Sequence, residues 1–133
     1  NAALAAERFR PELLDDLEAT IDQQIVENAI GADADRRFHI IIAEATGNRA
    51  LVEITTYLWE QMQSSHMWNL LIEHAQLQGL YPIILDDHRS LMNALRQRDS
   101  ESARSIMETH LEHAKEIFFD LVSYQTKNGN SGK

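Results

Sequence analysis

Cysteine is absent from this chain, and proline and glycine are scarce. Without cysteine, neither a disulfide framework nor a thiolate metal site can form. Two prolines and five glycines leave long stretches free to form helices. No run approaches the roughly 20 apolar residues of a transmembrane helix, and no signal-peptide pattern opens the chain. These absences predict a cytoplasmic helical protein with no membrane segment.

Positive charge is scarce as well: 12 Lys and Arg stand against 21 Asp and Glu, which gives a formal net charge of −9. Because phosphate binding needs clustered Lys and Arg, this segment is not expected to bind DNA by itself. Its 133 residues make one ordinary globular domain. The segment Asn1 to Arg8 is helix-forming but has no start signal, which indicates a domain cut from a longer protein. Any DNA contact is expected from the missing part.

Helix start and stop signals divide the chain into about six helices, and no useful stretch alternates with period two. Pro11 and Gly31 bound the first long helix, Gly47 ends the next, and Asn48 and Asp99 are predicted caps. The expected ranges are about 11–30, 34–46, 49–62, 66–79, 81–98 and 101–124. Residues 1–126 are therefore predicted to form an all-α antiparallel bundle, and the polar tail 127–133 to be disordered.

Apolar residues at three- and four-residue spacing define the face that each helix is expected to bury. The first long helix carries this stripe at Leu14, Leu17, Ile21, Ile25 and Ala29. The third long helix carries it at Leu51, Ile54, Leu58 and Met62.

Ionisable side chains interrupt three such stripes. Asp35 and His39 lie one helical turn apart, and His88 and His110 each interrupt the stripe of a later helix. An ionisable group that is buried without a partner costs free energy. Three interruptions by ligand-type side chains therefore indicate that these residues meet at one point. They predict a divalent-metal site inside the bundle.

Plainer interpretations stay open for each residue. The helix dipole alone favours an acidic residue such as Asp35 in a first turn, and a core histidine often only hydrogen-bonds to an oxygen. His113, one turn from His110, is an alternative ligand. Asp86 and Asp87 are either solvated or accept a hydrogen bond from a ligand histidine.

Three neutral imidazoles and one carboxylate suit Zn²⁺ or Ni²⁺ and leave one or two coordination positions open. Such a centre is either a Lewis-acid catalyst or a docking point for a small anion. The other two histidines, His66 and His74, fall in a less regular segment and are expected to be exposed.

Three motifs make the chain recognisable: DRRFH at 35–39 with AEATGN at 43–48, DHRSL at 87–91, and the stripe from 99 to 111. In this order and spacing they resemble the ligand-binding (FCD) domain of the FadR-type GntR transcription regulators. The resemblance covers roughly residues 2 to 125. It implies an antiparallel bundle with a central cavity, a homodimer, and a winged helix-turn-helix that is missing from this chain.

The resemblance also implies a site. In the metal-binding branch of the family, the ligand positions correspond to Asp35, His39, His88 and His110, the same four residues that interrupt the stripes. A small organic acid is thought to bind the metal there and to contact nearby polar side chains. The expected effector contacts in this chain are Arg36, Asn48, Gln61 and Arg89. Residues proposed for dimer contacts are Leu4, Phe9, Phe118 and Phe119.

A further similarity, at 58–62, 67–68 and 77–88, is to regulators of sugar-acid (hexuronate) catabolism. The resulting hypothesis is an effector sensor and not an enzyme. A rival hypothesis is a small metal-dependent hydrolase, but it needs a general base, and periodicity puts neither Glu44 nor Glu73 inside. A metal-free helical dimerisation module is the third alternative.

Overall fold

The computed structural model describes residues 2–28 and 33–131, and these ranges contain seven helices and no strand. The all-α fold predicted from the sequence is therefore confirmed. The helices are α1 (Ala2–Glu7), α2 (Glu12–Glu27), α3 (Asp33–Ala45), α4 (Arg49–Gln63), α5 (His66–Leu77), α6 (Tyr81–Arg96) and α7 (Ser100–Ser131).

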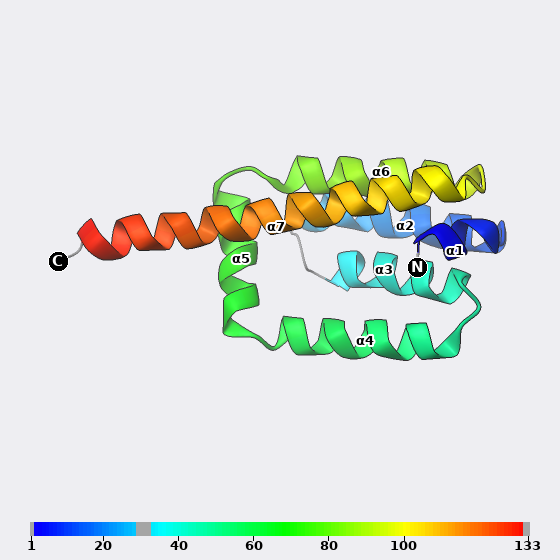
Figure 1. The fold of residues 1–133 in the computed structure, drawn as a ribbon, viewed down its shortest axis with the longest axis horizontal. Helices are drawn as coiled ribbons and strands as arrows, with labels where there is room; N and C mark the ends of the chain where they lie inside the picture. Colours follow the sequence, from blue (N-terminus) through cyan, green and yellow to red (C-terminus); the bar gives the residue numbers. More distant parts are fainter. Residues whose placement is uncertain (1, 29–32, 132–133) are drawn as a thin grey trace.

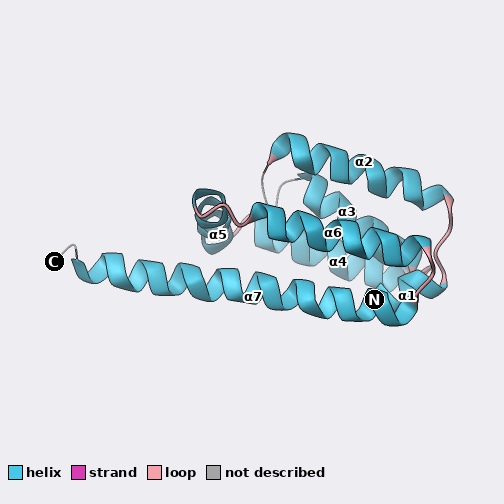
Figure 2. Cartoon of the chain, turned by 90° about the horizontal axis from the view of Figure 1, so that it is seen from above, coloured by secondary structure: helices cyan, strands magenta, loops and turns pink. Residues whose placement is uncertain are grey.

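Most of the helices run along one common direction, with α3 between α2 and α4, and α6 alongside α7 (Figure 1). Helix α5 runs across this direction and connects the end of α4 to the start of α6. Helix α7 is the longest, and its C-terminal part extends beyond the rest of the bundle (Figure 2). Packed contacts of α3, α6 and α7 with α1 close the body around one core.

Local capping explains where several helices begin and end. Asn48 precedes α4, and its Oδ1 accepts a hydrogen bond from the Ala50 N–H at 3.0 Å. Asp99 precedes α7 and accepts bonds from the Ser102 N–H and hydroxyl at 3.0 and 2.7 Å. Gly47, just after α3, has a φ of +70°, which glycine adopts at little cost. These two caps and this stop are as predicted.

The buried faces of α2 and α4 differ from the predicted stripes. In α2, Gln24 is fully buried whereas Ile25 is 45% exposed. In α4, Ile54 and Leu58 are more than half exposed, and Trp59 is the buried side chain. The predictions counted aliphatic residues only, but an indole buries more apolar area than an isoleucine. The amide of Gln24 is buried because it hydrogen-bonds to a histidine of α6.

Other expectations also need correction. Phe9, proposed as a dimer contact, is 4% exposed and belongs to the core, whereas Phe118 and Phe119 are exposed. His74 is buried, not exposed, because its Nε2 lies 2.6 Å from an Asp120 oxygen on α7. Helix α7 extends to Ser131, so residues 127–131, expected to be disordered, are helical.

The predicted helix end at Gly31 and the last two residues of the predicted tail lie outside the described residues. None of the helices in the described ranges is both long enough and apolar enough to cross a membrane.

Candidate metal centre

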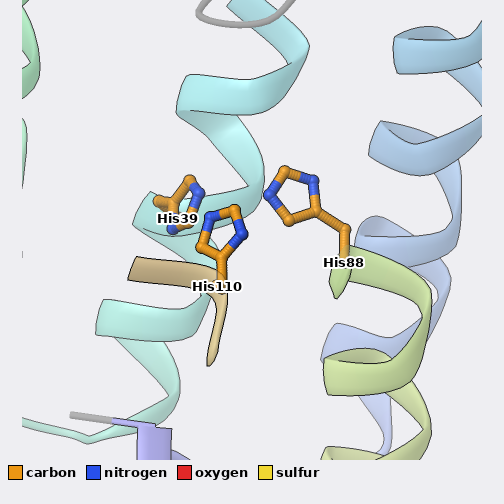
Figure 3. Close-up of side chains that lie close together, drawn as sticks. All are labelled: His39, His88 and His110. Atoms are coloured by element: carbon orange, nitrogen blue, oxygen red, sulfur yellow. The ribbon is translucent and has the colours of Figure 1, made fainter. Parts of the chain in front are cut away.

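Three histidines from three different helices converge in the core of the bundle (Figure 3). His39 comes from α3, His88 from α6 and His110 from α7, and one ring nitrogen of each lies within 4.8 Å of the others. Asp35, one turn before His39, has its Oδ1 at 3.3 Å from His39 Nε2 and 3.6 Å from His88 Nε2. The structure thus brings together all four residues that interrupt the apolar stripes.

His88 is the innermost of the three. Its Nδ1 lies 2.6 Å from the side-chain oxygen of Gln24, and its ring stacks on Phe38 with a centroid distance of 4.3 Å. Its Nε2 is buried and makes no hydrogen bond to any residue that the structure describes. Burial lowers the pKa of His88 to about 3; the Asp35 carboxylate opposes this shift, and His39 and His110 add to it. The imidazole is therefore neutral near pH 7, as a metal ligand must be.

His110 is held by a carboxylate. Its Nδ1 lies 3.1 Å from Asp87 Oδ2, and the Nδ1 of His113 lies 2.7 Å from the same oxygen. Burial lowers the pKa of His110, and the bond to Asp87 partly opposes this shift. His113 is 30% exposed at its side chain and is not among the three clustered histidines. Asp87 therefore orients His110, and not the adjacent His88 that follows it in the chain.

His39 lies at the outer side of the cluster, next to a cavity. Its ring stacks on Trp59 of α4 and on His110, with centroid distances of 5.4 and 5.5 Å. The cavity has a volume of about 310 Å³ and lies between α1, α3, α4 and α7. It is lined by Ala2, His39, Ile42, Ala43, Thr55, Trp59, Met107 and Leu111. This volume matches the smaller ligand pockets of proteins.

The predicted effector contacts do not share this cavity lining. Asn48 caps α4, and Gln61 is exposed near the end of the same helix. Arg89 is exposed on α6, 3.7 Å from Asp86. Arg36 extends from α3 toward α4, where its Nη2 lies 3.7 Å from Glu60 Oε1.

Sequence reasoning missed three residues of the site. Gln24 follows Gln23 and lies off the predicted aliphatic stripe, a pattern that is typical of surface residues. Tyr81 lies at the start of a predicted helix, and its hydroxyl donates to the Gln24 carbonyl at 2.8 Å. Trp59 lies next to Leu58 of the predicted stripe, on a face of its helix where no burial is expected. The available signal was the position of Gln24 and Trp59, each next to a residue of a predicted stripe, where a small rotation of the helix would bury them.

The donor set fits a divalent metal ion. The His88 Nε2 faces Asp35 Oδ1 at 3.6 Å and has no hydrogen bond within the described part of the chain. An unprotonated imidazole nitrogen that faces a carboxylate oxygen would bring two electron-rich atoms together, and a cation between them would relieve that repulsion. Outer hydrogen bonds to Gln24 and Asp87 hold two of the rings, as is usual for ligand histidines. Three imidazoles and a carboxylate are borderline ligands that suit Zn²⁺ or Ni²⁺.

The molecule is an all-helical bundle with a histidine cluster at its centre. Sequence comparison shows the family to which it belongs. The model of the FCD domain matches residues 1–113. The chain therefore belongs to the FCD domain family, as its motifs predict.

Its relatives are transcription regulators. It is 30% identical to the Uxu operon regulator of Haemophilus influenzae over 97 residues. This aligned region covers 73% of this chain and 36% of that protein. The Uxu operon transcriptional regulator of Escherichia coli K12 is 32% identical over 75% of this chain and 40% of its own length. The Exu regulon transcriptional regulator of the same strain is 35% identical over 67% of this chain and 34% of its own. The chain thus spans well under half of each relative. No solved structure matches it significantly.

Proposed function

We propose that this chain is the effector-sensing domain of a transcription regulator, with Asp35, His39, His88 and His110 holding one Zn²⁺ or Ni²⁺ ion. The observation that carries the proposal is the convergence of three ring nitrogens within 4.8 Å from α3, α6 and α7. Membership in the FCD family and the regulator relatives support it. When bound, the ion supplies a Lewis-acidic centre with open positions for ligand oxygen atoms.

The effector that fits this site best is a small carboxylate, and a hexuronate in particular. The resemblance to sugar-acid regulators and the similarity to the Uxu and Exu regulators support this choice. The cavity beside His39 has apolar walls, a hydroxyl from Thr55 and the indole of Trp59. In the proposed complex, the indole packs against the C–H face of the sugar ring, and the carboxylate of the effector points to the metal ion.

The chain's own residues then link the site to the bundle. His39, His88 and His110 come from three helices. The affinity for an ion or effector bound by them therefore depends on how these three helices are placed relative to one another. An effector shifts this arrangement only as far as it binds one arrangement better than another, typically by about 1–3 kcal/mol. In the whole protein, we propose a homodimer that contacts DNA through a separate domain, because the −9 charge of this chain disfavours phosphate binding.

Metal content per chain tests the proposal first. We expect a near-stoichiometric metal ion in the chain purified without a His tag, its loss in His110→Ala, and its retention in the exposed-site control His66→Ala. Metal in none of the three, or equal metal in all three, would contradict the site.

Calorimetric titration then tests the effector class. Galacturonate and glucuronate are expected to bind the metal-loaded chain and to lose binding after chelation. Glucose is the matched control, because it has a similar ring without the carboxylate. Equal binding of glucose, or hexuronate binding that survives chelation, would refute a carboxylate docked at the metal.

A further inference from the structure

The innermost histidine has an orienting partner that is an amide. His88 Nδ1 and Gln24 Oε1 lie 2.6 Å apart, and neither side chain is exposed to solvent. The two residues belong to α6 and α2 and are 64 positions apart in the chain. An amide oxygen can only accept a hydrogen bond, so the proton of this contact belongs to His88 Nδ1.

We propose that Gln24 is a positioning residue of the candidate metal centre: its side-chain oxygen keeps the His88 proton on Nδ1, which presents an unprotonated Nε2 to the ion. A neutral imidazole carries one N–H, so fixing it on Nδ1 leaves the lone pair on Nε2. This inference rests on the proposed function for its metal, but the proton position can be measured without one.

Gln24 is itself held in place. Its backbone carbonyl accepts a bond from the Tyr81 hydroxyl at 2.8 Å and another from the Asn28 N–H at 2.9 Å. On the other side, the Phe38 ring stacks on the His88 ring at 4.3 Å. The amide thus fixes His88 within the plane of its ring, and Phe38 fixes its face.

The choice of an amide follows from burial. His110, nearer the surface, is oriented by the partly exposed carboxylate of Asp87. A carboxylate at position 24 would add a charge where no solvent reaches, at a large cost in free energy. An amide supplies the same acceptor without a charge.

The amide has two orientations with opposite consequences. With the oxygen toward His88, the Gln24 Nε2 is buried and has no hydrogen-bond partner among residues 2–28 and 33–131. With the amide reversed, its N–H₂ would donate to Nδ1 and the His88 proton would move to Nε2. A protonated Nε2 cannot bind a metal ion, so the two orientations make opposite predictions.

Long-range ¹H–¹⁵N correlation spectra of the histidine rings in the metal-free chain decide between them. We expect His88 to show a protonated Nδ1 and an unprotonated Nε2, assigned by comparison with His88→Gln. In Gln24→Met, which keeps the side-chain length without the amide oxygen, both forms of His88 are expected. The control Thr20→Val also removes a buried polar group from α2, a hydroxyl that donates to the Leu17 carbonyl, and should leave His88 unchanged. A proton on Nε2 in the wild type would overturn the inference.

Zn²⁺ affinity, measured by competition with a chromophoric chelator, completes the test. Loss of an outer partner of a ligand histidine typically costs about 10–100-fold in metal affinity, and we expect this loss in Gln24→Met but not in Thr20→Val. Equal affinity of Gln24→Met and wild type would overturn the positioning role even if the metal centre exists. Absence of Zn²⁺ binding in every variant, with the proton on Nδ1 as expected, would instead refute the metal centre and reduce the Gln24 bond to a structural contact.

Discussion

At the scale of single residues, His88 makes the stability of the metal-free chain depend on pH. Burial lowers its pKa from 6.5 to about 3. Between these two values the unfolded chain binds a proton that the folded chain does not, so the folded state loses stability as the pH falls below about 6.5. The loss continues down to the folded-state pKa, with a limiting slope of about 1.4 kcal/mol per pH unit for one histidine.

Urea unfolding of the metal-free chain at about pH 7, 6 and 5 measures this slope. We expect the slope between pH 6 and 5 to fall in His88→Gln and to stay as in the wild type in His66→Gln, whose side chain is exposed. A wild-type free energy of unfolding that does not change over this range would contradict a neutral, buried His88.

The sequence could predict the clustered residues because each of them breaks a rule. His39, His88 and His110 stand out on apolar stripes, and one shared centre accounts for all three breaks. Gln24 could not be found in this way, since its burial depends on a partner 64 positions away. The same limit applies to the choice between His110 and His113, which depends on the exact rotation of α7.

At the scale of helices, a contact between a buried histidine and an exposed carboxylate connects α5 to α7. His74 is 4% exposed and its Nε2 lies 2.6 Å from Asp120 Oδ2. Asp120→Ala would leave the buried His74 nitrogen without this partner, and we expect a loss of about 1–3 kcal/mol in the free energy of unfolding. The matched control on α7 is Glu108→Ala, which removes only an exposed pair with Arg104 and should cost about 0.5 kcal/mol or less.

Chemical denaturation of both variants provides the measurement. The difference in the free energy of unfolding between Asp120→Ala and Glu108→Ala reports the loss of the partner of the buried His74, and not the loss of a carboxylate as such. Equal costs for the two variants would show that the His74–Asp120 contact does not hold α5 against α7.

The cap of α4 separates stability from effector binding. Asn48→Ala removes the acceptor for the Ala50 N–H, and we expect it to cost about 1 kcal/mol of stability, whereas Asn48→Asp keeps the cap and costs little. Hexuronate titration of the same variants tests the sequence-based expectation that Asn48 contacts the effector. If it does, both variants bind more weakly; if Asn48 is only a cap, both bind as the wild type does.

Helix starts and stops that a cap or a glycine marks are more predictable than helix faces. Caps and stops are local: Asn48, Asp99 and Gly47 act within their own turns, and all three were read correctly from the sequence. Faces depend on what packs against them. The aliphatic stripe of α4 predicted the wrong buried face. Trp59 stacks on the His39 ring of α3, and this contact turns the Trp59 side of α4 toward the core.

At the scale of the whole molecule, a metal ion bound by three helices should stabilise the bundle. Asp35 and His39 share α3, but His88 and His110 join it only in the folded state. An ion that binds the folded chain alone adds about 2.7 kcal/mol at a free concentration 100 times its Kd. For a domain of this size, that corresponds to a rise in Tm of roughly 10 °C.

Scanning calorimetry with and without Zn²⁺ measures the rise in Tm, and three variants show whether it comes from the histidine cluster. His88→Ala and His110→Ala should abolish the Zn²⁺-dependent rise in Tm, whatever their own stability without metal. His66→Ala should keep the full rise, because an exposed histidine on α5 takes no part in the cluster. A rise that persists in His88→Ala would mean that Zn²⁺ acts at another site on this acidic surface. No rise in the wild type would mean that the histidines are core groups, held by Gln24 and Asp87 without an ion.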